Sequence, residues 1–205
     1  MQLTQPFEQT AAHLPTRCGR WTDEALIKRE PRGPVERVDW PALLRPRGQS
    51  VDLFAPNTTR SYIARNGARA ALESLAGSPI AGDIVVSGSF AAVRIAPVAA
   101  PALLVLYLRP QAARPSFDST AQELGLLESD QGSDVVLLRP ANERVIEDTR
   151  RVDGLAMVNL PQLVVDCLGG TGRMPAEGEA VLEWMRANEN EWRFPSLDAY
   201  LAARP

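Results

Sequence analysis

The segment from Asp83 to Leu108 constrains this chain more than any other stretch. It reads DIVVSGSFAAVRIAPVAAPALLVLYL: an apolar strand over 83–87, a short helix that opens at Gly88-Ser89, and a second apolar strand over 102–108. A Gly-Ser pair at the start of a helix can hold a phosphate on free backbone N–H groups. The pattern therefore predicts a strand–turn–helix–strand unit, with the helix over 88–96, inside a mixed sheet.

This layout is that of a nucleotidyltransferase core, but the second strand lacks the side chains that such chemistry uses. Phosphoryl transfer needs acidic residues on the following strand to hold metal ions. The strand here, Leu103–Leu108, contains no acid. We therefore expect neither catalysis, cofactor nor metal. Gly88 would permit a tight turn and Ser89 would cap the helix, whereas contact with a nucleotide phosphate is the alternative.

Length and composition fit a globular protein of one large domain, or one domain with a small appendage. The chain has 205 residues, of which 45% are hydrophobic and 23% charged. No apolar run approaches the roughly 20 residues that span a bilayer, and the N-terminus lacks the pattern of a signal peptide. We therefore expect a cytoplasmic protein that has no membrane partner.

The number and spacing of cysteine and histidine residues limit the kinds of metal site and catalytic site that the chain can form. Cys18 and Cys167 stand far apart without metal-ligand spacing, which is typical of a reduced compartment. The single histidine, His13, argues against a histidine-dependent catalytic triad. Asp166 and Cys167 adjoin in a predicted helix, so a general base or a thiol nucleophile is one interpretation. A buried cysteine beside an exposed or capping aspartate is the other.

The N-terminal quarter is mildly basic and contains a hairpin pattern. Residues 1–50 carry eight Lys or Arg against six Asp or Glu. We expect a helix over 21–28, a hairpin over 28–40 that turns at 31–34, and one helical turn over 40–44 that ends before Pro46. The candidate DNA-binding residues are Lys28, Arg29, Arg32 and Arg37. They would contact phosphates or a minor groove, or they belong to a solvated turn.

Strands and helices alternate along the rest of the chain, which predicts an α/β or α+β fold with flanking helices. Further strands are expected over 51–54, 61–64, 126–128, 135–139 and 155–158. Further helices are expected over 66–76, 116–124, 161–168, 175–192 and 197–203. The strands over 126–128 and 135–139 are expected to pair with each other. In the helix over 175–192, Ala176, Ala180, Val181, Trp184, Met185 and Trp192 form an apolar stripe. We expect this stripe in the core; a protein-binding face around Trp184, Met185 and Trp192 is the alternative.

Four sequence segments together resemble those of a known protein family. They are RGPVERVDWPALL (32–44), IVVSGSFAAVRIAPVAAP (84–101), DVVLLRP (134–140) and LPQLVVDCLGGTGRMPAEGEAVLEWMRANENEW (160–192). Over residues 22–193 the chain resembles the AbiEi-type antitoxins and transcriptional regulators of type IV toxin–antitoxin systems. The resemblance implies a DNA-binding winged helix, an antitoxin domain, autoregulation of the operon, and a nucleotidyltransferase toxin as partner.

The predicted domains follow from that resemblance, except that the N-terminal segment differs from a complete winged helix. A winged helix needs two or three helices before its wing, and residues 1–20 show no such pattern. Residues 1–50 are therefore interpreted as a partial or degenerate winged-helix segment, and residues 51–205 as a nucleotidyltransferase-like antitoxin domain with C-terminal helices.

The Gly-rich loop over 169–179 has two interpretations. Either Arg173 in this loop contacts an anion or a partner, or the loop is a tight connection between packed helices.

These observations favour a non-catalytic transcriptional regulator and antitoxin. One alternative is a nucleotidyltransferase whose metal ligands come from other segments, such as Asp52, Asp83 or Asp134. Another is a protein-binding module that docks through its helical C-terminal end.

Overall fold

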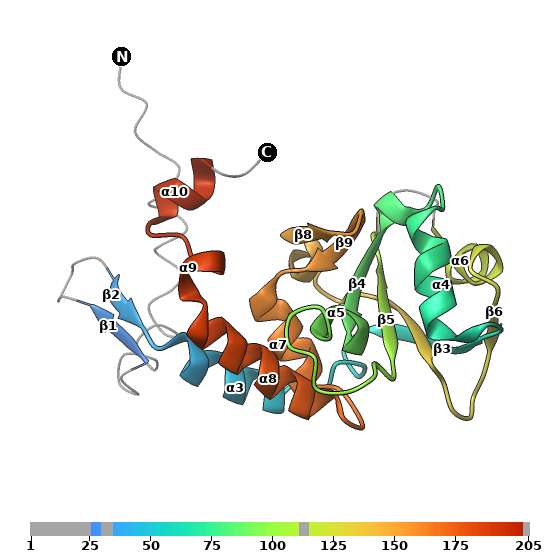
Figure 1. Ribbon diagram of the computed structural model, residues 1–205, viewed down its shortest axis with the longest axis horizontal. Coiled ribbons are helices and arrows are strands. Elements are labelled where there is room, and N and C mark those ends of the chain that lie inside the picture. The colour runs from blue at the N-terminus through green and yellow to red at the C-terminus, as the bar shows by residue number, and fades with distance from the viewer. Residues whose placement is uncertain (1–25, 30–34, 111–114, 203–205) are drawn as a thin grey trace, which may run out of the picture. The chain divides into compact units, whose positions relative to one another are not determined.

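The structure is a computed structural model and describes residues 26–29, 35–110 and 115–202 (Figure 1). The chain divides into two compact units, Met1–Pro46 and Arg47–Pro205. In the first unit, β1 (Ile27–Arg29) and β2 (Val35–Val38) form an antiparallel hairpin, as predicted. The helix expected over 21–28 is wrong at its end, because Ile27 and Lys28 belong to β1. The rest of that helix and the turn over 31–34 lie outside the described residues.

Helix α3 (Trp40–Gln49) is longer than predicted, because it continues through Pro46. Asp39 accepts a hydrogen bond from the Ala42 N–H at 3.2 Å and so caps its start. Proline removes one backbone hydrogen bond from a helix, but its φ is helical. The last turn is fixed by packing: Gly48 is buried, and a Cβ there would lie 2.5 Å from the Cβ of Leu168. A tertiary contact therefore outweighs the local stop signal.

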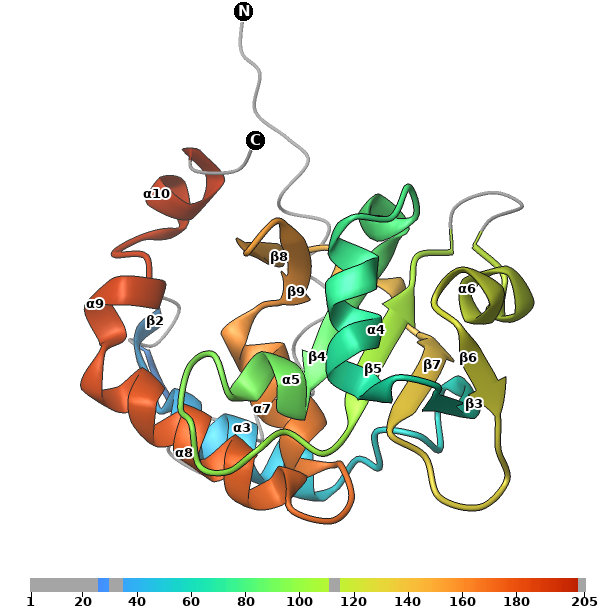
Figure 2. The same cartoon turned by 45° about the vertical axis from the view of Figure 1, so that its right-hand side comes forward.

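The second unit is built on a seven-stranded mixed sheet in the order β6-β3-β7-β5-β4-β9-β8 (Figures 1 and 2). The strands are β3 (Thr58–Ala64), β4 (Ile84–Gly88), β5 (Leu104–Leu108), β6 (Leu126–Glu128), β7 (Val135–Arg139), β8 (Thr149–Val152) and β9 (Leu155–Val158). The pairs β5–β7 and β4–β9 are parallel and the others antiparallel. Every residue of β4 and β5 is buried, so these strands form the centre of the core.

Two strand predictions are wrong for identifiable reasons. β6 and β7 do not pair, because β3 lies between them and pairs with both. The connection between β6 and β7 is bonded to β3 at both of its ends, since the Ser129 N–H donates to the Ser61 carbonyl and the Asp134 N–H to the Tyr62 carbonyl. Residues 51–54 form no strand, because the Asp52 carboxylate accepts from the N–H groups of Phe54 and Ala55 and holds a turn.

Helices flank the sheet, which confirms the predicted mixed α/β class. They are α4 (Gly67–Ala76), α5 (Ser89–Ala92), α6 (Phe117–Glu123), α7 (Leu160–Leu168), α8 (Met174–Ala187), α9 (Glu189–Trp192) and α10 (Leu197–Ala202), with single turns η1 (Ala81–Asp83) and η2 (Glu143–Ile146). In Figure 2, α4 lies in front of β4 and β5. The helix expected over 88–96 is shorter, since α5 ends at Ala92.

The helix expected over 175–192 is divided at Asn188 into α8 and α9. Val181 and Met185 are buried as predicted, but Ala176 is exposed. Trp192 is half-buried, and its indole N–H donates to the Met185 carbonyl at 2.8 Å. No helix among the described residues combines the length and the apolar character needed to cross a membrane.

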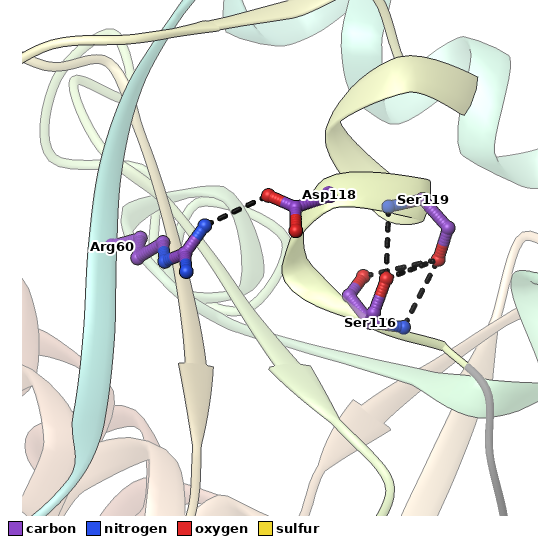
Figure 3. A network of polar contacts seen from close by, with 4 residues as sticks. All are labelled: Arg60, Ser116, Asp118 and Ser119. Carbon is purple, nitrogen blue, oxygen red and sulfur yellow. Dashed lines mark hydrogen bonds and ion pairs between the residues drawn. The ribbon is translucent and has the colours of Figure 1, made fainter.

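Helix α6 begins with a capping box formed by Ser116 and Ser119. The Ser116 hydroxyl accepts from the Ser119 N–H, and the Ser119 hydroxyl accepts from the Ser116 N–H, both at 3.0 Å (Figure 3). Asp118, in the first turn of α6, forms an ion pair of 2.8 Å with Arg60 of β3 (Figure 3). Asp118 is 84% exposed, so this pair contributes little to stability. The capping box is the stronger local determinant of α6.

Candidate functional site

The turn at the end of β4 has the tight geometry that its glycine predicts. Gly88 has a φ of 68°, in the left-handed region, and a Cβ there would lie 2.7 Å from Cγ2 of Val105. Both features require glycine. Ser89 is the first residue of α5, and no side chain caps that helix. The predicted capping role of Ser89 is therefore wrong, and its hydroxyl has another partner.

The serines on either side of Gly88 both donate hydrogen bonds to buried carboxylates. Ser87 Oγ donates to Oδ2 of Asp166 in α7, and Ser89 Oγ donates to Oε2 of Glu177 in α8, each at 2.6 Å. All four side chains are at most 3% exposed. We call Ser87, Ser89, Asp166 and Glu177 the serine–carboxylate cluster. Acidic groups therefore reach this turn from the C-terminal helices rather than from β5.

Asp166 has the most complete set of hydrogen bonds in the cluster. Gln162 Nε2 donates to its Oδ1 at 2.6 Å, and the Tyr107 hydroxyl of β5 also hydrogen-bonds to it. Burial raises the pKa of Asp166 to about 6, while these hydrogen bonds and that from Ser87 oppose the shift. Burial, followed by the proximity of Asp166, raises the pKa of Tyr107. The prediction of an exposed or capping Asp166 is wrong.

Cys167 is buried, as predicted for an apolar cysteine. Burial and, after it, the charges of Asp166 and Glu177 raise the pKa of its thiol. A raised pKa disfavours the thiolate, which is the nucleophilic form. The helices also approach closely here, since a Cβ on Gly178 would lie 3.0 Å from the Cβ of Cys167. These contacts give Cys167 a packing role.

Glu177 has one carboxylate oxygen in a hydrogen bond and one without a partner. Its Oε2 accepts from Ser89, whereas Oε1 is buried and takes no hydrogen bond within the described residues. Burial of such a polar atom is costly, which makes Ser89 an important partner. The side chains of the cluster are almost inaccessible to solvent. In this conformation the Ser87 hydroxyl holds β4 to α7, the Ser89 hydroxyl holds the start of α5 to α8, and neither is exposed to a nucleotide.

Arg173 lies outside the cluster, on the exposed loop between α7 and α8. Its guanidinium forms no hydrogen bond with the part of the chain that the structure describes. The loop itself is tightly held, because Gly169 accepts from the Leu53 N–H at 2.9 Å and has no room for a Cβ beside the Val51 carbonyl. The connection is therefore compact, and Arg173 stays available to an external anion.

The three aspartates considered as alternative metal ligands do not gather at the turn. Asp83 is the last residue of η1, directly before β4, and lies about 17 Å along the strand from Gly88 at the opposite end. Asp134 lies at the Gly88 end of the sheet, since its carbonyl accepts from Leu104, but its carboxylate accepts from the Ala64 N–H at 2.8 Å. Asp52 holds its own turn. Among the described residues, no group of three or more His, Cys, Asp or Glu side chains has a geometry that could hold a metal ion.

The basic residues of the hairpin are a separate candidate, for binding nucleic acid. Lys28 and Arg37 are exposed and directly opposite each other across β1 and β2. Arg29 is the cross-strand partner of Val35, and Arg32 lies outside the described residues. Opposed residues in an antiparallel pair have Cβ atoms about 5 Å apart, so two cationic side chains are presented side by side. A phosphate group is small enough to contact both of them.

Comparisons of the chain with family models, with curated proteins and with solved structures find no match. The description of the cluster and of the hairpin therefore rests on their own contacts.

Proposed function

We propose that this chain is a non-catalytic transcriptional regulator and antitoxin of the AbiEi type. It binds operator DNA through the β1–β2 hairpin, represses its own operon and counteracts a nucleotidyltransferase toxin. The family part of this proposal rests on the resemblance over residues 22–193. The observation that carries the DNA-binding part is the exposed cross-strand pair of Lys28 and Arg37.

The non-catalytic part rests on the residues around Gly88. Strand β5 presents only Leu104, Val105, Leu106, Tyr107 and Leu108, all of them buried. The hydroxyls of Ser87 and Ser89 are already hydrogen-bonded to Asp166 and Glu177. A strand of this composition supplies no carboxylate to a metal ion that would bridge nucleotide phosphates.

Titration of DNA binding against salt tests the DNA-binding part. Fluorescence anisotropy with the DNA upstream of the gene should give an affinity that falls steeply with salt. The double variant Lys28→Gln/Arg37→Gln should reduce the slope of log K against log salt by about 2, since each lost phosphate contact lowers it by roughly 1. Arg186→Gln/Arg193→Gln removes two exposed charges, one on α8 and one directly after α9, and should leave the slope unchanged. An unchanged slope in the hairpin variant would exclude this surface.

Incubation with labelled nucleotides and Mg²⁺ or Mn²⁺ tests the non-catalytic part. The expected result is no transfer of label. Reproducible transfer that Ser89→Ala abolishes would overturn the proposal and favour the enzyme interpretation.

Co-expression tests the antitoxin part. A nucleotidyltransferase encoded beside this gene should be toxic alone and tolerated when this chain is present. Toxicity that persists at equal expression of the two proteins would contradict the antitoxin role.

A further inference from the structure

A small pocket opens between α4, α5 and the β8–β9 turn, and none of its lining residues belongs to the serine–carboxylate cluster. Its volume is about 170 Å³. Its floor is apolar and includes Leu72 of α4, Phe90 of α5 and Leu155 of β9, each at most 5% exposed. An apolar cavity of roughly 150 Å³ holds one benzene molecule, and sites for drug-sized ligands are roughly 300–1,000 Å³. The pocket therefore suits an apolar group about the size of a phenyl ring.

Two of the four charged residues that line the pocket neutralise each other. Arg94 Nε donates to Oδ2 of Asp153 at 3.1 Å, and its Nη1 donates to the Phe90 carbonyl at 3.0 Å. Asp153 has a φ of 52° and Gly154 a φ of 80°, as in the two-residue turns that join hairpin strands. This turn places the Asp153 carboxylate beside Arg94. Both residues line the pocket, and their opposite charges balance each other.

The other two charges are exposed, and within the described residues neither forms an ion pair or a hydrogen bond. They are Arg69 and Glu73, which lie one turn apart on α4 and line the same pocket. Residues at i and i+4 are neighbours on a helix, but a basic residue that precedes an acidic one is the less favourable order for a pair. One cation and one anion therefore stand beside an apolar cavity and are available to a ligand.

We propose that this pocket binds a free hydrophobic α-amino acid, with phenylalanine as the best fit. The side chain enters the apolar cavity, Arg69 binds the carboxylate and Glu73 binds the ammonium group. A peptide terminus fits less well, because it carries only one of the two charges beside its apolar side chain. The proposal is independent of DNA binding and of the antitoxin role.

Titration of the full chain with L-phenylalanine, N-acetyl-phenylalanine and phenylalaninamide tests the assignment. Binding is measured by calorimetry and by chemical-shift changes at the amides of Phe90, Val93 and Leu155. Phenylalanine should bind saturably in the millimolar range. Each analogue lacks one charge and should bind about 3- to 10-fold more weakly, as expected for exposed charge contacts. No saturable change at these amides, or equal affinity for all three compounds, would overturn the proposal.

Two charge-neutralising variants separate the roles of the rim residues. Arg69→Gln should weaken phenylalanine about 3- to 10-fold and leave phenylalaninamide unchanged, because the amide has no carboxylate to lose. Glu73→Gln should weaken phenylalanine and leave N-acetyl-phenylalanine unchanged. Arg65→Gln removes an exposed charge just before α4 and outside the pocket, and should change none of the affinities. A rim variant that weakens all three ligands equally would contradict the assigned contacts.

Discussion

Replacement of Asp166 by asparagine should change how the stability of the fold depends on pH. Asp166 is 2% exposed, and burial raises its pKa from 3.8 to about 6. Asparagine has nearly the same shape and keeps an oxygen that accepts from Ser87. The Gln162 amide can rotate to accept from the new Nδ2. The substitution therefore removes the carboxylate charge and preserves the packing.

The sign and size of the effect follow from the two pKa values. A folded-state pKa above the unfolded one means that the folded state binds more protons between about pH 4 and pH 6. The stability that Asp166 contributes is therefore complete below pH 4 and is lost as the pH rises through 6. Two pKa units correspond to about 3 kcal/mol at 1.4 kcal/mol per unit. Roughly 2 kcal/mol of this loss falls between about pH 4 and pH 7.

Urea unfolding of both proteins across this pH range measures the difference directly. The free energy of unfolding of Asp166→Asn minus that of the natural chain should rise by about 2 kcal/mol between about pH 4 and pH 7, with equal m-values. Asp118→Asn is the matched control at a position 84% exposed, and its difference should stay within about 0.5 kcal/mol. A difference for Asp166→Asn that is flat, or that falls with pH, would refute the argument that burial controls this carboxyl group.

Three further substitutions, two at the Gly88 turn and one at the start of α6, are tested by the free energy of unfolding in urea. Gly88→Ala should destabilise the fold by about 1–3 kcal/mol because of the positive φ of Gly88 and its close contact with Val105. The control Gly82→Ala, at a position with open space around it, should change the stability little. Equal costs for the two variants would contradict the close-approach argument. Ser89→Ala should cost about 1–3 kcal/mol, because it removes the one hydrogen-bond partner of Glu177. Ser87→Ala should cost less, because Asp166 keeps its hydrogen bonds to Gln162 and Tyr107. The reverse order would be evidence against the cluster. Ser116→Ala should cost about 1 kcal/mol through loss of the α6 cap, and no change would mean that the capping box is not stabilising.

Features encoded by a few neighbouring residues could be predicted from the sequence. Gly88 between two serines marks the tight turn, Ser116 marks the start of α6, and Gly77 ends α4. The two central strands, β4 and β5, follow from short apolar runs bounded by turn residues. Each signal acts within one turn or one strand, so no tertiary information is required.

Features set by distant contacts could not be predicted in this way. The insertion of β3 between β6 and β7 depends on hydrogen bonds from the 129–134 connection to Ser61 and Tyr62. The extension of α3 beyond Pro46 depends on the contact of Gly48 with Leu168. In both places a local rule gives the wrong result, because the residues that decide the outcome are far away in the sequence.

The buried positions of Asp166 and Glu177 could have been recognised from the helical spacing of the sequence. They are easily overlooked because acidic residues are usually exposed. In α8, Met174, Gly178, Val181, Leu182 and Met185 are buried, and Glu177 lies on that same stripe at helical spacing. In α7, Asp166 lies three residues after Leu163 and four after Gln162, its hydrogen-bond partner. An acid on an apolar stripe indicates a buried polar partner, and both partners here are serines of one turn.

The two serine–carboxylate contacts explain why acids are kept at such costly positions. Buried charges add little net stability compared with apolar side chains, but they can select one arrangement among several that bury similar apolar surface. An apolar stripe alone allows α7 and α8 to slide or rotate against β4, because dispersion and burial are not directional. A hydrogen bond of 2.6 Å from each helix to a fixed serine removes that freedom. We therefore infer that the serine–carboxylate cluster fixes the position and rotation of α7 and α8 against the sheet. The hydroxyls of Ser87 and Ser89, on either side of Gly88, are both bound in this cluster. The turn that suggests nucleotide binding in the sequence therefore helps to hold the fold together.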